Sequence, residues 1–504
     1  MSKFDPTDIE HYLGRYSLGR DSNPMNITDS LHFLRVKVPG GFLTSKQFHG
    51  IADLVKKYSK GQAEITDRED IQLHWVRSED SLAIFKEMED LGFTTDMCGQ
   101  GFGGARYGDP RNVICCPVSG LEKEEIINGR PLMEKLTKYL IGNPDFLDMP
   151  KKFKFSISGC GSDCVRGVTN DLAYVGVKKG DEIGYTLFIG GSAGSTQPGP
   201  RLAKPLRVFI RPDEAFDVGI KIIEIHRDHS NRESKIKARF KWLVSEWGTE
   251  KIKEMLIEKL GRPFEAYKGP TFLYNSNHEG IQLQSQEGKY YINIPLLGGR
   301  LSSDDMIYLA DIAENYGTAE LRLTPTQNII IPDIENKDDV IKKLEERNFS
   351  LKGPKLKWSS IGCSSDFCGK TIEPHVKQVV ANIVNYIIEN YEYKLLNESG
   401  IIIQGNGCPN HCCASNLAEI GFSGMVTKIE GKQLQVYNIV LGGGVGPNAI
   451  LGRVTERRIP SDQLIEKISL LIDNYITKRQ DSEKFRDFCN RHSIVELQSF
   501  LIKK

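Results

Sequence analysis

Cysteine side chains form two pairs in the second half of the chain, and their type and spacing could hold a metal centre. Cys408 and Cys412 are separated by three residues in the run GNGCPNHCC, and they follow Cys363 and Cys368 by about forty residues. Four thiolates in two pairs suit an iron–sulfur cluster, because such clusters bind soft anionic sulfur. The same residues could bind zinc, although structural zinc sites more often have two residues between paired ligands. Unligated thiols are the third interpretation of this pattern.

Bulk composition limits the classes of function. The chain has 504 residues, too long for one hydrophobic core, and its 66 Lys and Arg residues balance 66 Asp and Glu residues. No global charge favours a nucleic acid or a membrane surface, so recognition by charge must be local. The first residues carry no targeting pattern, and no run of about eighteen apolar residues occurs. We expect a cytoplasmic protein without nucleic-acid or membrane partners, in which eleven cysteines indicate metal or redox chemistry.

The chain contains an internal duplication. Residues 33–76 and 291–334 correspond without a gap at a constant shift of 258 positions, as from Gly40 to Gly298. Each copy runs from an alternating strand through a Gly-Gly turn into an amphipathic helix with a Ser or Thr cap, and then into a second strand. This strand–helix–strand pattern predicts a compact α+β unit, a ferredoxin-like half-domain, in each copy.

The segments behind the two units also correspond, so the predicted fold class is α+β with two pseudo-twofold halves. The run CGSDC at 160–164 parallels CPNHC at 408–412, and the Gly-Gly pair at 190–191 parallels that at 442–443. A charged helix over 234–260 and a loop join the halves, and the cleft between them is the natural place for a large cofactor. The predicted domains are two half-domains (20–85 and 275–345), two larger α/β domains (86–255 and 346–480) and a helical tail (481–504).

The first half carries its own cysteines, in a degenerate version of the second set. They are Cys115, Cys116, Cys160 and Cys164. We interpret them as a relic of the duplication, packed as small apolar side chains. A second cluster stays open as an alternative, although the glycine-rich run before Cys115 has no ordinary ligand spacing. Cys413, next to Cys412, is interpreted as a bystander.

Polar residues distinguish the first copy from the second. Where the first copy reads TDREDIQLHW, the second reads TPTQNIIIPD. Arg68, Gln72 and His74 are therefore predicted to lie on one face of a strand, spaced by two or four residues. They could be a solvated strand edge, or polar groups that the first half kept to bind a ligand.

Taken together, these features resemble the sirohaem-dependent nitrite/sulfite reductase family over nearly the whole chain. The motifs are LRVKVPGG, TDREDIQLHW, PRNVICCP, KKFKFSISG, the two cysteine pairs and EKFRDFCNR. The resemblance implies a sirohaem and a 4Fe–4S cluster that share the sulfur of Cys412. Cys363, Cys368 and Cys408 would hold the other irons. Family members have five residues between the first two cysteines, whereas this chain has four.

The resemblance also implies a set of residues around the haem. Sirohaem carries eight carboxylates, so cations and amide donors should surround it, including backbone N–H groups of the LGGGVG turn. Two lysines spaced by one residue could alternatively guard an exposed strand edge. The implied substrate-binding, catalytic residues are Arg35, Arg111, Lys152 and Lys154. The implied cofactor-binding residues are Arg68, Gln72, His74, Asn410, Cys412, Gly442 and Gly443.

From this resemblance we expect six-electron reduction of sulfite, a small oxyanion, to sulfide. The family's sulfite reductases tend to read Lys-Phe-Lys where its nitrite reductases have Asn at the third position, and this chain has Lys154 there. Reduction of nitrite to ammonia is the nearest alternative, and oxidation of a cobalamin-type ring or a non-catalytic zinc- or cluster-bearing binding protein is more remote. No nucleotide-binding motif follows a strand, so the electrons must come from an external ferredoxin or flavoprotein.

Overall fold

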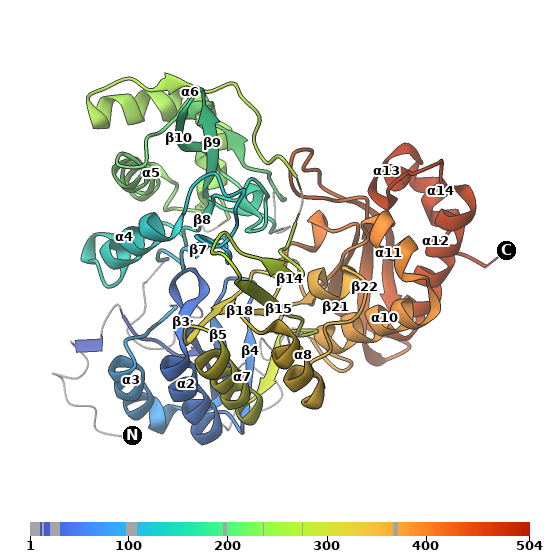
Figure 1. Ribbon diagram of the computed structural model, residues 1–504. Helices are drawn as coiled ribbons and strands as arrows, with labels where there is room; N and C mark the ends of the chain where they lie inside the picture. The colour runs from blue at the N-terminus through green and yellow to red at the C-terminus, as the bar shows by residue number, and fades with distance from the viewer. Residues whose placement is uncertain are drawn as a thin grey trace.

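The molecule has three lobes. The two duplicated units, which are far apart in the chain, form one lobe together, and the segments that follow each unit form the other two. The computed structural model describes residues 11–12, 15–20, 31–96, 108–194, 199–234, 236–274, 276–365 and 371–503. In Figure 1 one lobe combines blue N-terminal elements with olive elements from the middle of the chain, a second is teal and green, and a third is orange and red.

Two similar units of strands and helices form the first lobe, which confirms the predicted repeat. The side chain of Thr44 accepts a hydrogen bond from the backbone N–H of Gln47 at the start of one helix, and Ser302 accepts one from Asp305 at the other. The first unit contains β2 (Leu31–Lys37), β3 (Phe42–Thr44), α2 (Ser45–Tyr58), β4 (Gln62–Ile65), β5 (Ile71–Arg77) and α3 (Ser81–Asp90). The second contains β15 (Tyr290–Ile294), β16 (Arg300–Ser302), α7 (Ser303–Tyr316), β17 (Glu320–Leu323), β18 (Ile329–Ile334) and α8 (Lys337–Glu346).

The two units exchange one short strand, which the sequence did not reveal. β3 pairs antiparallel with β17 of the other unit, and β16 pairs with β4. The sheets run β1–β2–β5–β4–β16, with β6 beside β2, and β14–β15–β18–β17–β3. α2 and α7 pack together, and one hydrophobic core takes side chains from both units. The edge strands are β1 (Gly19–Arg20), β6 (Thr94–Thr95) and β14 (Gly280–Leu283).

Each of the other two lobes is built on a five-stranded sheet, and the two sheets have the same topology. Two parallel pairings are followed by two antiparallel ones in both sheets. The first contains β7 (Ile114–Cys115), β8 (Phe155–Ser158), β9 (Leu172–Lys179), β10 (Glu182–Ile189) and β11 (Lys204–Pro205). The second contains β19 (Ile361–Gly362), β20 (Ile403–Asn406), β21 (Ile420–Ile429), β22 (Lys432–Leu441) and β23 (Arg453–Pro460).

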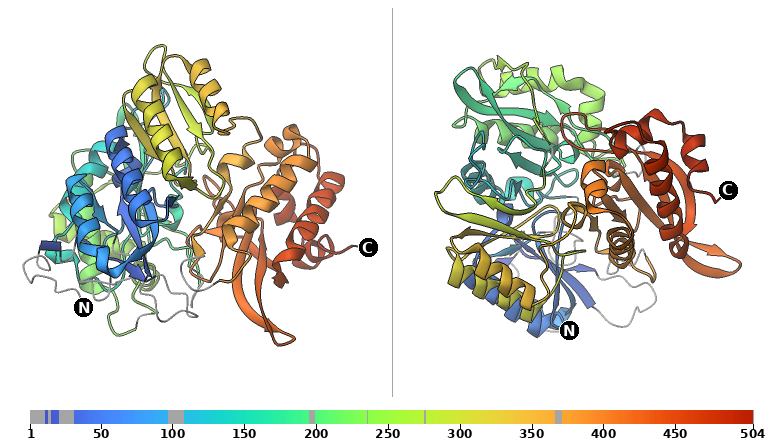
Figure 2. Two further views of the ribbon diagram at one scale, coloured as in Figure 1. Left: turned by 90° about the horizontal axis from the view of Figure 1, so that it is seen from below. Right: turned by 45° about the vertical axis from the view of Figure 1, so that its right-hand side comes forward.

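Helices cover these sheets, and each lobe has its own apolar core. Figure 2 shows the orange and red lobe standing beside the rest of the molecule, with its helices grouped together. The first lobe of this kind contains α4 (Arg130–Leu140), α5 (Ala215–His229) and α6 (Phe240–Leu260), with the short pair β12 (Val208–Phe209) and β13 (Glu265–Ala266). The second contains α9 (Leu356–Ser359), α10 (Val376–Asn390), α11 (Tyr393–Ser399), α12 (Leu464–Lys478), α13 (Phe485–Arg491) and α14 (Ile494–Ser499).

The connecting helix begins later than its charge pattern predicts. α6 starts at Phe240 rather than at residue 234, because the backbone of Arg239 is extended and its guanidinium donates to Asp171, 2.9 Å away. Arg239 is thereby turned toward the interior instead of lying on a helix surface. Within the described part of the chain, no helix is long and apolar enough to cross a membrane.

Candidate cofactor and substrate site

The cysteines of the second half lie at the carboxyl ends of two adjacent parallel strands. Cys363 directly follows β19, and the loop with Cys408 and Cys412 follows β20. The backbone N–H of Gly407 donates to the Sγ of Cys363 at 3.2 Å, a contact that stabilises a thiolate. The structure therefore brings three of the four predicted ligands to one edge of a sheet. Cys368 lies outside the described residues.

Close packing shapes this loop. A Cβ on Gly407 would lie 2.4 Å from the Cγ2 of Thr371 and 2.5 Å from the Cβ of Ser365, so only glycine fits there. Cys413 is buried in the apolar core, and its backbone N–H donates to the side chain of Asn406 at 2.8 Å. Its placement agrees with its interpretation as a bystander.

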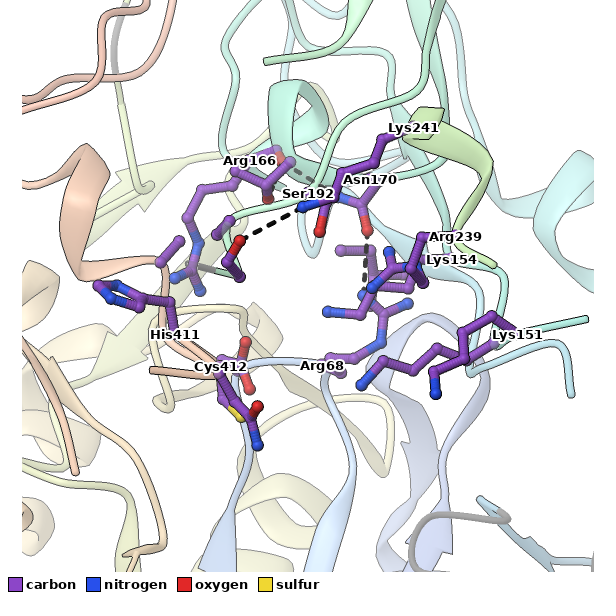
Figure 3. A pocket seen from close by; sticks show the side chains of 18 of the residues that line it. Arg68, Lys151, Lys154, Arg166, Asn170, Ser192, Arg239, Lys241, His411 and Cys412 are labelled. Carbon is purple, nitrogen blue, oxygen red and sulfur yellow. Dashed lines mark hydrogen bonds between the residues drawn. The ribbon is translucent and has the colours of Figure 1, made fainter. Parts of the chain in front are cut away.

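A cavity of about 590 Å³ opens between the lobes, and Cys412 is exposed to it. Figure 3 shows Cys412 and His411 on one side of this space and Arg68, Lys151, Lys154 and Arg239 on the other. Among its described lining residues seven are Lys or Arg and only Asp67 is acidic. The cations are Arg68, Lys151, Lys152, Lys154, Arg166, Arg239 and Lys241.

A second, smaller cavity of about 190 Å³ shares part of this wall. Both cavities are lined by Arg68, Lys152, Lys154, Asn410 and Cys412. The lining unique to the smaller cavity includes five further residues that the sequence predicted for the site. They are Arg35, Gln72, Arg111, Cys363 and Cys408. The four predicted substrate-binding cations therefore lie beside three of the predicted cluster ligands.

The electrostatics of the cavity favour an anionic occupant. Burial, together with the charges of Arg68 and Lys152, lowers the pKa of Lys154 to about 7. A bound anion would offset this repulsion and raise the pKa again. The Nε atoms of Arg68 and Arg239 have no hydrogen-bond partner in the described part of the structure. These donors fit a cofactor with many carboxylates, as sirohaem has.

A buried carboxylate anchors two of the predicted substrate-binding arginines. Asp96 lies 3.4 Å from Arg111, 3.6 Å from Arg35 and 3.8 Å from Lys37. Burial alone would raise the pKa of Asp96, but these three cations hold it below its ordinary value. Its stabilising contribution is therefore present above the pKa of an unfolded Asp, about 3.9, and is lost as the pH falls further.

We expect Asp96→Asn to lower the free energy of unfolding by about 3–5 kcal/mol, because the buried Lys37 and Arg111 and the partly buried Arg35 lose the carboxylate that they share. Thermal unfolding at pH 7 measures this loss, and turnover should fall because the two arginines lose their anchor. Asp109→Asn is the matched control: burial raises the pKa of Asp109 to about 6, although it too contacts Arg111. Asp109→Asn should therefore change the free energy of unfolding little. Equal losses of stability in both variants would exclude the anchoring role of Asp96.

The three polar residues that distinguish the first copy do not share one strand face. Because β5 begins only at Ile71, Arg68 lies in the turn before the strand. There its guanidinium donates to the Oδ1 of Asn170 at 3.1 Å. Gln72 does lie on β5 and accepts from the Nη2 of Arg35 at 2.7 Å. His74 lies away from the cavities, in a buried contact with the Oε2 of Glu64 at 3.3 Å.

The Gly-Gly pair at 442–443 also takes a different role from the one predicted. The N–H of Gly442 donates to the carbonyl of Glu419, and that of Gly443 donates to the carbonyl of Ala418. A Cβ on Gly443 would lie 2.7 Å from the carbonyl oxygen of Asn416. These glycines allow the chain to pass closely over another loop, and their amides are already used.

Four cations of the larger cavity were missed by the sequence reasoning. Arg166, two residues after Cys164, reaches across to the other half and donates to the carbonyl of Cys413 at 3.2 Å. Lys241 donates to the carbonyl of Gly199 at 2.6 Å. The run KARFKW, with Arg239 and Lys241, has the same alternation of cations as KKFKF, which begins at Lys151. This alternation is the signal that could have pointed to Arg239 and Lys241.

Comparisons with known proteins show similarity over most of the chain. Residues 107–264 match the family described as "Nitrite and sulphite reductase 4Fe-4S domain". Residues 24–91 and 282–347 match the family described as "Nitrite/Sulfite reductase ferredoxin-like half domain". The solved structure of the Mycobacterium tuberculosis NirA protein superposes with a TM-score of 0.87 and 25% identity, covering 98% of this chain and 92% of that one.

Curated relatives extend over nearly the whole chain. A ferredoxin–nitrite reductase from Leptolyngbya laminosa is 30% identical, with 94% of this chain and 91% of the relative covered. A sulfite reductase [ferredoxin] from Mycobacterium tuberculosis H37Rv is 27% identical, with 94% and 84% covered. The chain therefore belongs to the nitrite and sulfite reductase family, whose cofactors are a sirohaem and a 4Fe–4S cluster.

Proposed function

We propose that this protein is a sulfite reductase, which reduces sulfite to sulfide with six electrons from an external donor. The observation that carries the proposal is the smaller cavity, where Lys154 and the three other predicted cations lie beside Cys412. Sulfite presents up to two negative charges and three oxygens, and a wall with several cations suits such an anion better than a singly charged one.

The proposed roles of the cysteines follow their positions. Cys412, exposed to the larger cavity, would be shared by the sirohaem iron and the cluster, and Cys363, Cys368 and Cys408 would bind the other irons. When bound, the two cofactors supply the electron transfer. Arg68 and Asn410 line both cavities and would orient the carboxylates of the haem.

The proposed substrate site consists of Arg35, Arg111, Lys152 and Lys154. These side chains would hold the oxyanion, donate hydrogen bonds to its oxygens and offset its charge. Arg35 and Arg111 stay oriented because they share Asp96. Lysine and arginine side chains, with ordered water, would also deliver the protons that accompany the electrons.

Nitrite is the second candidate substrate, because relatives of similar identity are named nitrite reductases and sulfite reductases. The same names support ferredoxin as the electron donor of this protein, with a flavoprotein as the alternative, and we propose that it acts in the cytoplasm.

Steady-state assays with reduced methyl viologen test the substrate directly. We expect a higher kcat/KM for sulfite than for nitrite, together with the strong visible absorption of sirohaem. A preference for nitrite of tenfold or more would make the protein a nitrite reductase. A purified protein with zinc but no haem spectrum would instead favour the non-catalytic binding protein.

A further inference from the structure

A compact group of metal-binding side chains lies in the first half, apart from both cavities. Cys116, Cys160, Cys164 and His278 are each at most 3% exposed, and one ligand atom from each lies within 4.8 Å of all the others. Among the residues that the structure describes, no other group of His, Cys, Asp or Glu side chains is placed to share a metal ion. We propose that these four residues bind one structural Zn²⁺ ion.

The spacing of the ligand atoms fits a single tetrahedral ion. Zinc binds sulfur at roughly 2.3 Å and nitrogen at roughly 2.0–2.1 Å, so tetrahedral geometry puts two sulfurs roughly 3.8 Å apart and sulfur and nitrogen roughly 3.6 Å apart. The Sγ atoms of Cys160 and Cys164 are 3.7 Å apart, and the Sγ of Cys116 is 3.6 Å from the Nε2 of His278. An iron–sulfur cluster needs wider spacing, because each thiolate binds a different iron.

The surroundings of the four residues are those of a metal site rather than of apolar packing. The Nδ1 of His278 lies 2.7 Å from the Oε1 of Glu122, which also accepts from the hydroxyl of Tyr291 at 2.8 Å. This carboxylate fixes the imidazole so that Nε2 faces the three sulfurs, as outer carboxylates do for zinc-bound histidines. The N–H of Ser162 lies 3.4 Å from the Sγ of Cys160 and donates to it.

The duplication explains how three of these ligands arose. Cys116 follows β7 as Cys363 follows β19, and each donates its N–H to the neighbouring parallel strand, to Ile157 and Gly405 respectively. The run 160–164 follows β8 as 408–412 follows β20. The second half keeps its thiols beside a cavity, whereas the first half closes its thiols inside the core, where a histidine completes the set.

Zinc accounts for this ligand set better than other ions do. Three thiolates and one imidazole are soft to intermediate ligands, which suit zinc and not magnesium or calcium. All four tetrahedral positions come from the protein and are buried, so the geometry is that of a structural site rather than a catalytic one. The conclusion differs from the interpretation of these cysteines as apolar relics.

The ion would fasten the connecting segment before β14 to the first half. Hydrogen bonds already join Ser276 to Ser162 at 2.9 Å and Leu273 to Gly161 at 2.6 Å around the site. Arg166, which crosses to the other half and lines the larger cavity, follows Cys164 by two residues. Zinc would therefore stabilise the segment that carries Arg166 in the wall of the larger cavity, without contacting the cofactor or the substrate.

Metal analysis of the purified full-length protein tests the proposal. We expect about one zinc per chain after dialysis, in addition to the iron of the cofactors, and zinc-edge X-ray absorption that fits three sulfurs and one nitrogen. Zinc-free protein, a Cys160–Cys164 disulfide, or a single iron in place of zinc would each overturn it. The zinc content should not change in Cys412→Ser, which separates this outcome from any failure of the proposed function.

Variants locate the ion. Glu122→Gln keeps the shape of the side chain, and we expect it to weaken zinc retention against a chelator by about 10- to 100-fold. Cys164→Ala should lose the zinc, whereas Cys115→Ala, a buried neighbour 3.5 Å from the hydroxyl of Ser119, should keep it. Unchanged zinc in both Glu122→Gln and Cys164→Ala would overturn the assignment to this site. If Cys164→Ala does not fold, zinc retention in Glu122→Gln and the zinc-edge X-ray absorption of the parent protein still decide whether zinc binds at this site.

Discussion

Cys412→Ser is expected to remove the sirohaem and to abolish reduction of sulfite. The reason is that Cys412 is exposed to the large cationic cavity and also lines the smaller one with Cys363 and Cys408, so its thiolate can serve two metal centres. A serine hydroxyl is a poor ligand for both. Loss of the visible haem absorption, loss of coupling between haem and cluster, and loss of methyl-viologen-dependent turnover measure the effect.

Cys413→Ala is the matched control, because it removes a thiol one residue away. Cys413 packs in the apolar core, so its truncation should cost about 1–2 kcal/mol of stability and leave both cofactors bound. If Cys412→Ser keeps a coupled haem and full turnover, Cys412 is not the shared ligand. Equal loss of haem in both variants would attribute the effect to disruption of the loop.

Much of the architecture could be predicted because the duplicated sequence carries each helix and strand pattern in both copies. The caps at Thr44 and Ser302 fix the starts of α2 and α7, and the helices keep the shift of 258 positions found in the sequence. Exchange of β3 and β16 could not be predicted in this way. A strand of three residues carries no register information by itself, and the pairing depends on how the two units pack.

Placement of the site residues shows a similar limit. Period-2 spacing predicted that Arg68 shares a strand with Gln72 and His74, but Glu69 has a positive φ of 60° and the strand starts after it. Arg68 still reaches the cavity, through a turn rather than a strand face. His74 instead contacts Glu64, which also binds Lys377 of the other half at 3.2 Å. Residues far apart in sequence decide such contacts, so local patterns do not reveal them.

We expect Lys154→Asn to shift the preference of the enzyme from sulfite toward nitrite. Lys154 lines both cavities, and an ammonium there favours a dianion with three oxygens over a monoanion with two. Loss of one charged hydrogen bond costs roughly 1.5–3 kcal/mol, which corresponds to about a ten- to hundredfold change in the ratio of the two kcat/KM values. Competitive turnover of sulfite and nitrite measures this ratio directly.

Lys151→Asn is the control for charge alone. Lys151 lies in the same segment and lines the larger cavity, but it is not part of the wall of the smaller cavity beside the cysteines. Removing it deletes the same charge, so it should weaken haem binding without changing the ratio of sulfite to nitrite turnover. If Lys154→Asn leaves the ratio unchanged, or if Lys151→Asn shifts it equally, the selectivity comes from the overall field of the cavity. A shift confined to Lys154→Asn assigns the discrimination to a contact with the oxyanion itself, because Lys154, unlike Lys151, lines both the larger cavity and the smaller cavity beside the cysteines.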